Sequence, residues 1–181
     1  MHRFHFTLAL AALALLFPTV AARAQSPSRS TASAVAAPVP PALLHAKTLF
    51  LSNAGADSGL FPSPYSGSPS RGYDELYADL AASHRFRLVS NPASADLVLE
   101  LRLTAPYIPY RPHNELGLAD RQPIFRLVIY DRPTHYILWA LTRPVETALL
   151  QRTSDRNFDS AVHSLAQQFL QLAGPPPATA P

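Results

Sequence analysis

The chain has 181 residues, of which 48% are hydrophobic, with 15 basic against 12 acidic side chains and no cysteine. This length suits one ordinary domain with flanking segments, and the lack of cysteine excludes disulfides, thiolate metal ligands and a cysteine nucleophile. The arginines are scattered singly along the chain instead of forming a basic stripe, so we expect no nucleic acid partner.

The first 24 residues have the pattern of a signal peptide. Arg3 and His5 precede an apolar run from Thr7 to Val20, and Ala22-Arg23-Ala24 is the small-x-small sequence that signal peptidase reads. The run is shorter than the roughly 20 residues that a spanning helix needs. We therefore expect cleavage before Gln25 and a periplasmic or secreted mature protein without a membrane span or a lipid anchor.

The folded part is predicted between two segments of low complexity. Residues 25–42 are nearly all alanine, proline, serine, threonine and valine, and residues 174–181 have a similar composition. Such segments bury too little apolar surface to offset the entropy of ordering them. We predict a disordered linker over residues 25–42, one domain over residues 43–173 and a disordered tail over residues 174–181.

In chain order, the domain begins with a short apolar strand, Lys47–Ser52, which a Gly/Ser/Pro-rich loop follows. A helix then runs from Tyr73 to His84, because its apolar residues recur at helical spacing. Two alternating segments come next, Arg85–Ser90 and Asp96–Leu103, with a pause at Asn91-Pro92. They indicate two strands, the second with one buried face.

The second half predicts a hairpin and a closing helix. A second long loop, Tyr107–Pro123, leads to the alternating segments Phe125–Tyr130 and Tyr136–Val145, which a turn sequence joins. The last helix has an apolar stripe of Phe158, Val162, Leu165, Phe169 and Leu172, with Ser154 or Asp155 as its N-cap and Gly174-Pro175 as its stop. Trp139 lies among the inward residues of its strand, so we expect it in the core.

The predicted order is strand, helix, four strands and helix. A strand-helix-strand start favours a parallel pair with a right-handed crossover, and the later strands can complete the sheet as a meander. Both helices have one apolar face that needs covering. We therefore predict an α+β fold with a mixed five-stranded sheet and two helices packed on one face.

Several segments together resemble small bacterial envelope proteins. These segments are Lys47-Thr48-Leu49-Phe50-Leu51, His84-Arg85-Phe86-Arg87-Leu88-Val89, Ala95-Asp96-Leu97-Val98-Leu99, Leu127-Val128-Ile129-Tyr130-Asp131 and Ile137-Leu138-Trp139. They look like the DUF4136-type lipoproteins, the N-terminal domain of TolB and the curli-secretion lipoproteins, over most of residues 46–173. The resemblance implies a non-enzymatic envelope component and supplies no catalytic residues. This chain departs from the lipoprotein members because it lacks their anchoring cysteine.

Two sets of residues are candidate chemical sites. His113, Glu115 and Asp120 share one loop and could supply imidazole and carboxylate ligands, although their spacing matches no established metal site. His84 and His135 could join an aspartate, Asp57 or Asp74, and a loop serine in a hydrolase triad, but no nucleophile-elbow sequence is present. We predict no catalytic residue, metal site or cofactor. A secreted hydrolase or metal-dependent enzyme using the His113 loop is the alternative.

The two long loops carry aromatic side chains between prolines, a composition that presents side chains on a stiffened backbone. The candidate partner-binding residues are Phe61, Tyr65, Tyr107, Tyr110 and Arg111. They predict a binding or adaptor module that docks an envelope protein or a glycan. Alternatively, the loops fold back over the edge of the sheet and cover it, and the protein has a structural or stress-related role.

Overall fold

The computed structural model describes residues 37–107 and 121–175. The predicted signal peptide, most of the predicted linker and most of the predicted tail therefore lie outside the described residues. In chain order the elements are α1 (Pro41–His45), β1 (Thr48–Ala56), α2 (Arg71–Ala82), β2 (Arg87–Leu88), the 3-10 turn η1 (Pro92–Ser94), β3 (Leu97–Thr104), β4 (Ile124–Asp131), β5 (Ile137–Pro144) and α3 (Gln151–Ala173).

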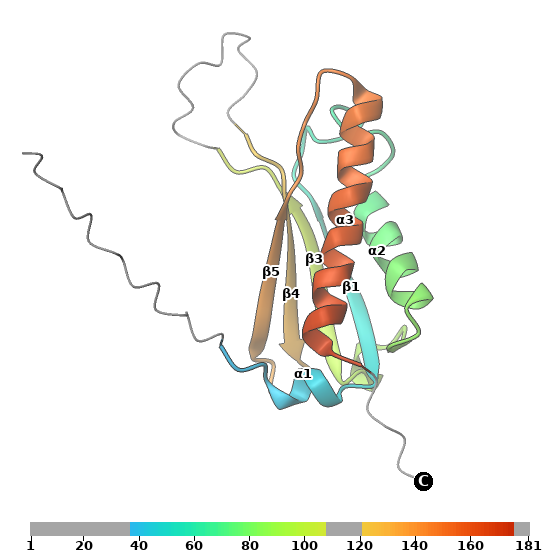
Figure 1. Cartoon of the computed structure of the whole chain (residues 1–181), viewed down its shortest axis with the longest axis vertical. Helices are drawn as coiled ribbons and strands as arrows, with labels where there is room; N and C mark the ends of the chain where they lie inside the picture. Colours follow the sequence, from blue (N-terminus) through green and yellow to red (C-terminus); the bar gives the residue numbers. More distant parts are fainter. Residues whose placement is uncertain (1–36, 108–120, 176–181) are drawn as a thin grey trace, which may run out of the picture. The chain divides into compact units, whose positions relative to one another are not determined.

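The strands form one five-stranded mixed sheet in the order β2-β1-β3-β4-β5. β1 is parallel to both β2 and β3, whereas β3, β4 and β5 form an antiparallel meander. Figure 1 shows α2 and α3 side by side over one face of this sheet, where α2 contacts β1 and β3, and α3 contacts β4 and β5. The α+β fold class predicted from the sequence is confirmed.

The core fills the space between the sheet and the two helices. β3 alternates strictly, so that its four leucines face the helices and are at most 3% exposed. The helix stripes meet them, and the largest fully buried side chains come from all layers: Tyr65, Phe125, Phe158, Phe169, Leu43, Leu49, Leu76, Leu80, Leu97, Leu99, Leu127 and Ile129. Trp139 is partly buried against this core, as predicted.

Several elements differ in extent from the sequence prediction; α2, for example, runs from Arg71 to Ala82 where a helix from Tyr73 to His84 is predicted. β1 continues beyond Ser52 to Ala56, because it keeps pairing with β3 past an irregularity between Asn53 and Ala56. β2 is reduced to Arg87 and Leu88, since the Asn91-Pro92 turn carries the chain away from β1. The short helix α1 was not predicted, and its Leu43 is fully buried.

The predicted N-cap of the last helix is wrong. α3 begins at Gln151, and the capping residue Leu150 makes no side-chain cap. Ser154 is buried one turn inside the helix, where its hydroxyl accepts a hydrogen bond from the Ala148 amide at 2.9 Å. The Asp155 carboxylate instead accepts a hydrogen bond from the Ser66 amide, in the connection between β1 and α2. The helix ends after Ala173, at Gly174 with a φ of 66°, where the sequence placed its stop.

A buried arginine joins the two ends of the domain. Arg85 is 8% exposed and donates to four carbonyls. These are the carbonyls of Leu44 and Ala46 at 3.0 Å each, of Gly174 at 2.9 Å and of Ala173 at 3.2 Å. Because the first pair lies at the end of α1 and the second at the end of α3, one side chain holds the C-termini of both helices.

Candidate functional site

Three connections meet at one end of the sheet, where β1 and β3 finish and β4 begins (Figure 1). Val145, just after β5, is the residue at which they join. Its carbonyl accepts a hydrogen bond from the Tyr65 hydroxyl at 3.4 Å and one from Nε2 of Gln122 at 3.0 Å. Its amide donates to the carbonyl of Pro123 at 2.8 Å. We call this region the loop end; its described residues are 57–70, 105–107, 121–123 and 145–150.

Two of the predicted docking residues pack inward at the loop end. Tyr65 is fully buried, and Phe61 is partly buried against the core. Both rings pack around Phe158 of α3, with centroid distances of 5.1 Å for Tyr65 and 5.9 Å for Phe61. The β1–α2 connection therefore folds back and packs these two rings against the core. The side chain of Tyr65 is not on the surface.

The remaining predicted docking residues lie in the β3–β4 connection. Tyr107 is 67% exposed, and it forms an isolated antiparallel bridge with Arg121. Tyr110 and Arg111 lie outside the described residues, together with the whole predicted His113 metal loop. The structure thus brings Phe61, Tyr65 and Tyr107 to the same end of the sheet, with Tyr107 as the exposed member.

The loop end also exposes two leucines that are not among the residues predicted to bind a partner. Leu149 is 84% exposed and Leu150 is 70% exposed, immediately before α3. Their position in the sequence does indicate exposure, because both leucines fall between the end of the alternating pattern of β5 and the start of the apolar stripe of α3. They therefore belong to neither buried pattern.

The segment that carries these leucines is held on both sides. The Ser154 hydroxyl contacts both the amide and the carbonyl of Ala148, at 2.9 and 3.2 Å. Nε2 of Gln151 donates to the carbonyl of Pro62 in the β1–α2 connection at 2.7 Å. The leucines are thus displayed on a fixed turn, and covering either would be worth about 1.5–3 kcal/mol.

A charged cluster fastens the β1–α2 connection to α3. Nη1 of Arg71 lies 2.7 Å from the Asp155 carboxylate and 3.2 Å from the carbonyl of Ser66. The Ser66 amide donates to the same carboxylate at 2.8 Å, and Nη2 of Arg71 bonds Asp159. The Ser66 amide and then Arg71 hold the pKa of Asp155 below its ordinary value. The guanidinium lies 4.6 Å from the centre of the Phe158 ring, which it covers.

The candidate histidines for a hydrolase triad lie at one end of the sheet, and the candidate residues Asp57 and Ser66 lie at the other. His84 follows α2 and His135 lies in the β4–β5 turn, both exposed and both with positive φ. Asp57 and Ser66 belong to the loop end, at the opposite end of the sheet from the two histidines (Figure 1). The described residues therefore assemble no triad from these side chains.

Over residues 37–107 and 121–175, no group of three or more histidine, aspartate and glutamate side chains is placed to hold a metal ion. Over the same ranges, no helix has both the length and the apolar character needed to cross a membrane.

Comparisons with known proteins gave matches to solved structures. No family model and no curated protein matches the chain. A point variant of the PelC dodecamer from Paraburkholderia phytofirmans is 15% identical, with 76% of this chain and 94% of that chain covered and a TM-score of 0.44. A DUF330 protein from Xanthomonas campestris is 13% identical, with 74% and 87% covered and a TM-score of 0.42.

A third structure is that of uncharacterized lipoprotein B from Nitrosomonas europaea. It is 14% identical, with 72% of this chain and 82% of that chain covered and a TM-score of 0.38. The DUF330 protein and the lipoprotein fit the predicted resemblance to small bacterial envelope proteins, although only at low sequence identity. Likenesses this distant do not bear on the function of this chain.

Proposed function

We propose that this chain is an exported, non-enzymatic binding module of the bacterial cell envelope, and that its loop end docks a protein partner. The observation that carries the proposal is the display of Leu149 and Leu150, which are 84% and 70% exposed on a turn held by hydrogen bonds. Adjacent large apolar side chains that are fixed and left in water are a feature of surfaces that a partner covers.

Tyr107 adds an aromatic side chain to the same end of the sheet. Tyrosine is enriched at interfaces because its ring buries apolar area while its hydroxyl stays hydrogen-bonded. With two exposed leucines at the same end of the sheet, the loop end favours apolar side chains of a protein over the hydroxyl-rich surface of a glycan. The partner-binding residues proposed from the described chain are therefore Tyr107, Leu149 and Leu150, with Phe61 and Tyr65 supporting them from the core.

Export is supported by the first 24 residues, in which a basic start, an apolar run and Ala22-Arg23-Ala24 occur in the order that secretion requires. A periplasmic or secreted location follows from this proposal. Its direct test is the mass of the protein recovered from the periplasm or medium, which should correspond to a chain that begins at Gln25. A full-length chain retained in the membrane fraction would contradict export.

The docking proposal can be tested by site-specific photocrosslinking in the cell envelope. A benzophenone amino acid placed at Leu149 should give a discrete adduct with one envelope protein. Excess mature wild-type protein should compete with this adduct, whereas a Leu149→Ser/Leu150→Ser variant should not. The matched control is Tyr136→Ser/Ile137→Ser, which removes two exposed apolar side chains from the opposite end of the sheet. This control should compete as well as wild type.

Two results would overturn the docking proposal. One is the absence of an adduct from position 149. The other is equal competition by the Leu149→Ser/Leu150→Ser variant and by wild type, since the leucines would then contribute nothing to the contact. Both leucines are exposed, so their replacement should change the stability of the fold by no more than about 0.5 kcal/mol. Loss of competition can therefore be separated from loss of folding.

A further inference from the structure

One edge of the sheet is open beside β1. The short strand β2 pairs with β1 at Thr48 and Leu49, whereas β1 itself extends to Ala56. Within residues 37–107, the last bond described between β1 and the β2 side runs from the Val89 amide to the carbonyl of Leu49, at 3.0 Å. Among the described residues, no strand covers this edge of β1 from Phe50 onward.

The direction of the backbone groups on this edge follows from the strand alternation. The carbonyl of Thr48 accepts from Asp96 on the β3 side, and the carbonyl of Lys47 accepts from Arg87 on the β2 side. Successive residues of a strand alternate in this respect. Leu51 and Asn53 therefore turn their amides and carbonyls toward the open edge, at the spacing that another strand would need.

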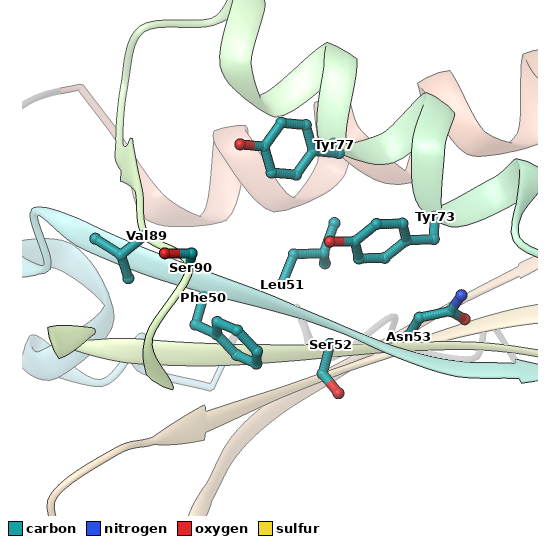
Figure 2. A pocket seen from close by; sticks show the side chains of 8 residues that line it. All are labelled: Phe50, Leu51, Ser52, Asn53, Tyr73, Tyr77, Val89 and Ser90. Carbon is teal, nitrogen blue, oxygen red and sulfur yellow. The ribbon is translucent and has the colours of Figure 1, made fainter. Parts of the chain in front are cut away.

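A groove of about 460 Å³ runs along this open edge. Figure 2 shows Tyr73 and Tyr77 projecting from α2 above β1, with Val89 and Ser90 at one end of the groove. The lining residues are all uncharged: Phe50, Leu51, Ser52, Asn53, Tyr73, Tyr77, Val89 and Ser90. Tyr77 is 44% exposed, so one wall of the groove is an accessible aromatic side chain.

We propose that an extended, uncharged peptide segment of another protein adds to the sheet beside β1. The segment continues the line of β2, pairs with the backbone of Leu51 and Asn53, and places alternate side chains against Tyr73 and Tyr77. Strand addition to an open edge is an established mode of peptide recognition, in which the backbone provides affinity and the flanking pockets provide specificity. This site is separate from the loop end and goes beyond the proposed function.

Two observations identify the occupant as a peptide of this kind. The groove continues a position beside β1 that an extended segment of this chain, β2, already fills. Its lining has no charged side chain, so a charged residue pointing inward would lose its hydration without gaining a partner. Uncharged β-branched or aromatic residues at alternate positions fit both conditions.

The test uses the mature protein and a random octapeptide library displayed on phage. Selection should enrich peptides with uncharged residues at alternate positions. An Asn53→Pro variant should bind the enriched peptides about tenfold more weakly or worse, which is about 1.4 kcal/mol, because proline lacks the amide that faces the groove. Proline is tolerated on an edge strand when its nitrogen faces outward, so pairing of β1 with β3 should persist.

The matched control is Asn53→Ala. Like the proline variant, it removes the 2.8 Å hydrogen bond from the Gly55 amide to the Asn53 side chain, but it keeps the backbone amide. It should bind the peptides within about twofold of wild type. Tyr77→Ser, which removes a wall of the groove without changing β1, should weaken binding as well. The Leu149→Ser/Leu150→Ser variant should bind them like wild type, which separates this proposal from docking at the loop end.

Amide hydrogen exchange gives a readout at single residues. Bound peptide should slow the exchange of the Asn53 amide and leave that of Ser52, which faces β3, unchanged. The proposal is overturned if no peptide is enriched on wild type beyond the level of Asn53→Pro, or if both bind the enriched peptides equally. A peptide-free dimer that Asn53→Pro dissociates would also overturn it, and would identify a second copy of this chain as the occupant.

Discussion

Replacing Arg85 by methionine tests how the two ends of the domain are held together. The guanidinium donates to four carbonyls, and its bonds to Ala46 and Ala173 are buried. A buried carbonyl that loses its donor costs about 1–3 kcal/mol, so these two bonds account for about 2–6 kcal/mol. Burial removes hydration from the charged guanidinium and so lowers the pKa of Arg85, and this loss of hydration offsets part of the gain. We therefore expect a net loss of about 2–4 kcal/mol in the free energy of unfolding.

Urea unfolding followed by the fluorescence of Trp139, the single tryptophan, measures this loss. Arg87→Met is the matched control, because its side chain is exposed two residues further along the chain, and it should change stability by no more than about 0.5 kcal/mol. Amides of α1 should also exchange faster in Arg85→Met. A value for Arg85→Met within about 1 kcal/mol of wild type would refute the view that this side chain closes the domain.

Two further substitutions test the core and the pH dependence. Gly72→Ala should lower stability by about 1–3 kcal/mol, because an added Cβ would lie 2.8 Å from Cε1 of Phe125. A gain of about 1 kcal/mol, as at an exposed helix site, would rule out this clash. Burial raises the pKa of Asp96, but hydrogen bonds from the Lys47 and Thr48 amides outweigh it and leave the pKa below its ordinary value. Asp96 should thus stabilise the fold above about pH 4 and lose this effect as the pH falls through its folded pKa, so Asp96→Asn should flatten the acid limb of stability against pH. An Asp96 carboxyl that titrates by NMR above its ordinary pKa would contradict this.

Local sequence patterns were sufficient to predict most strands of the sheet. The leucines of β3 alternate along the sequence, and such alternation has one physical reading when one face of a strand is buried. The β4–β5 turn was equally clear, because Asp131 begins it and accepts a hydrogen bond from the Thr134 amide at 3.1 Å. Both features depend on residues within a few positions of one another.

The candidate site was less accessible to sequence reasoning. Phe61 and Tyr65 lie in a loop of prolines, serines and glycines, a composition that is the same whether the aromatic rings face inward or outward. Their burial depends on Phe158 and Val145, which lie more than 75 positions further along the chain. The exposure of Leu149 and Leu150 likewise depends on where α3 begins, and the predicted cap placed that start too late.

The sequence by itself determined the fold class, the order of the elements along the chain apart from α1, and the buried faces of β3 and α3, since periodicity and turn chemistry are local properties. Tertiary structure decided which side chains reach the surface at the loop end, how far β2 covers the edge of β1, and what Arg85 binds. These depend on contacts between distant segments, such as Arg85 with Ala173 across 88 positions. No local pattern encodes such contacts, because they form when the helices pack on the sheet.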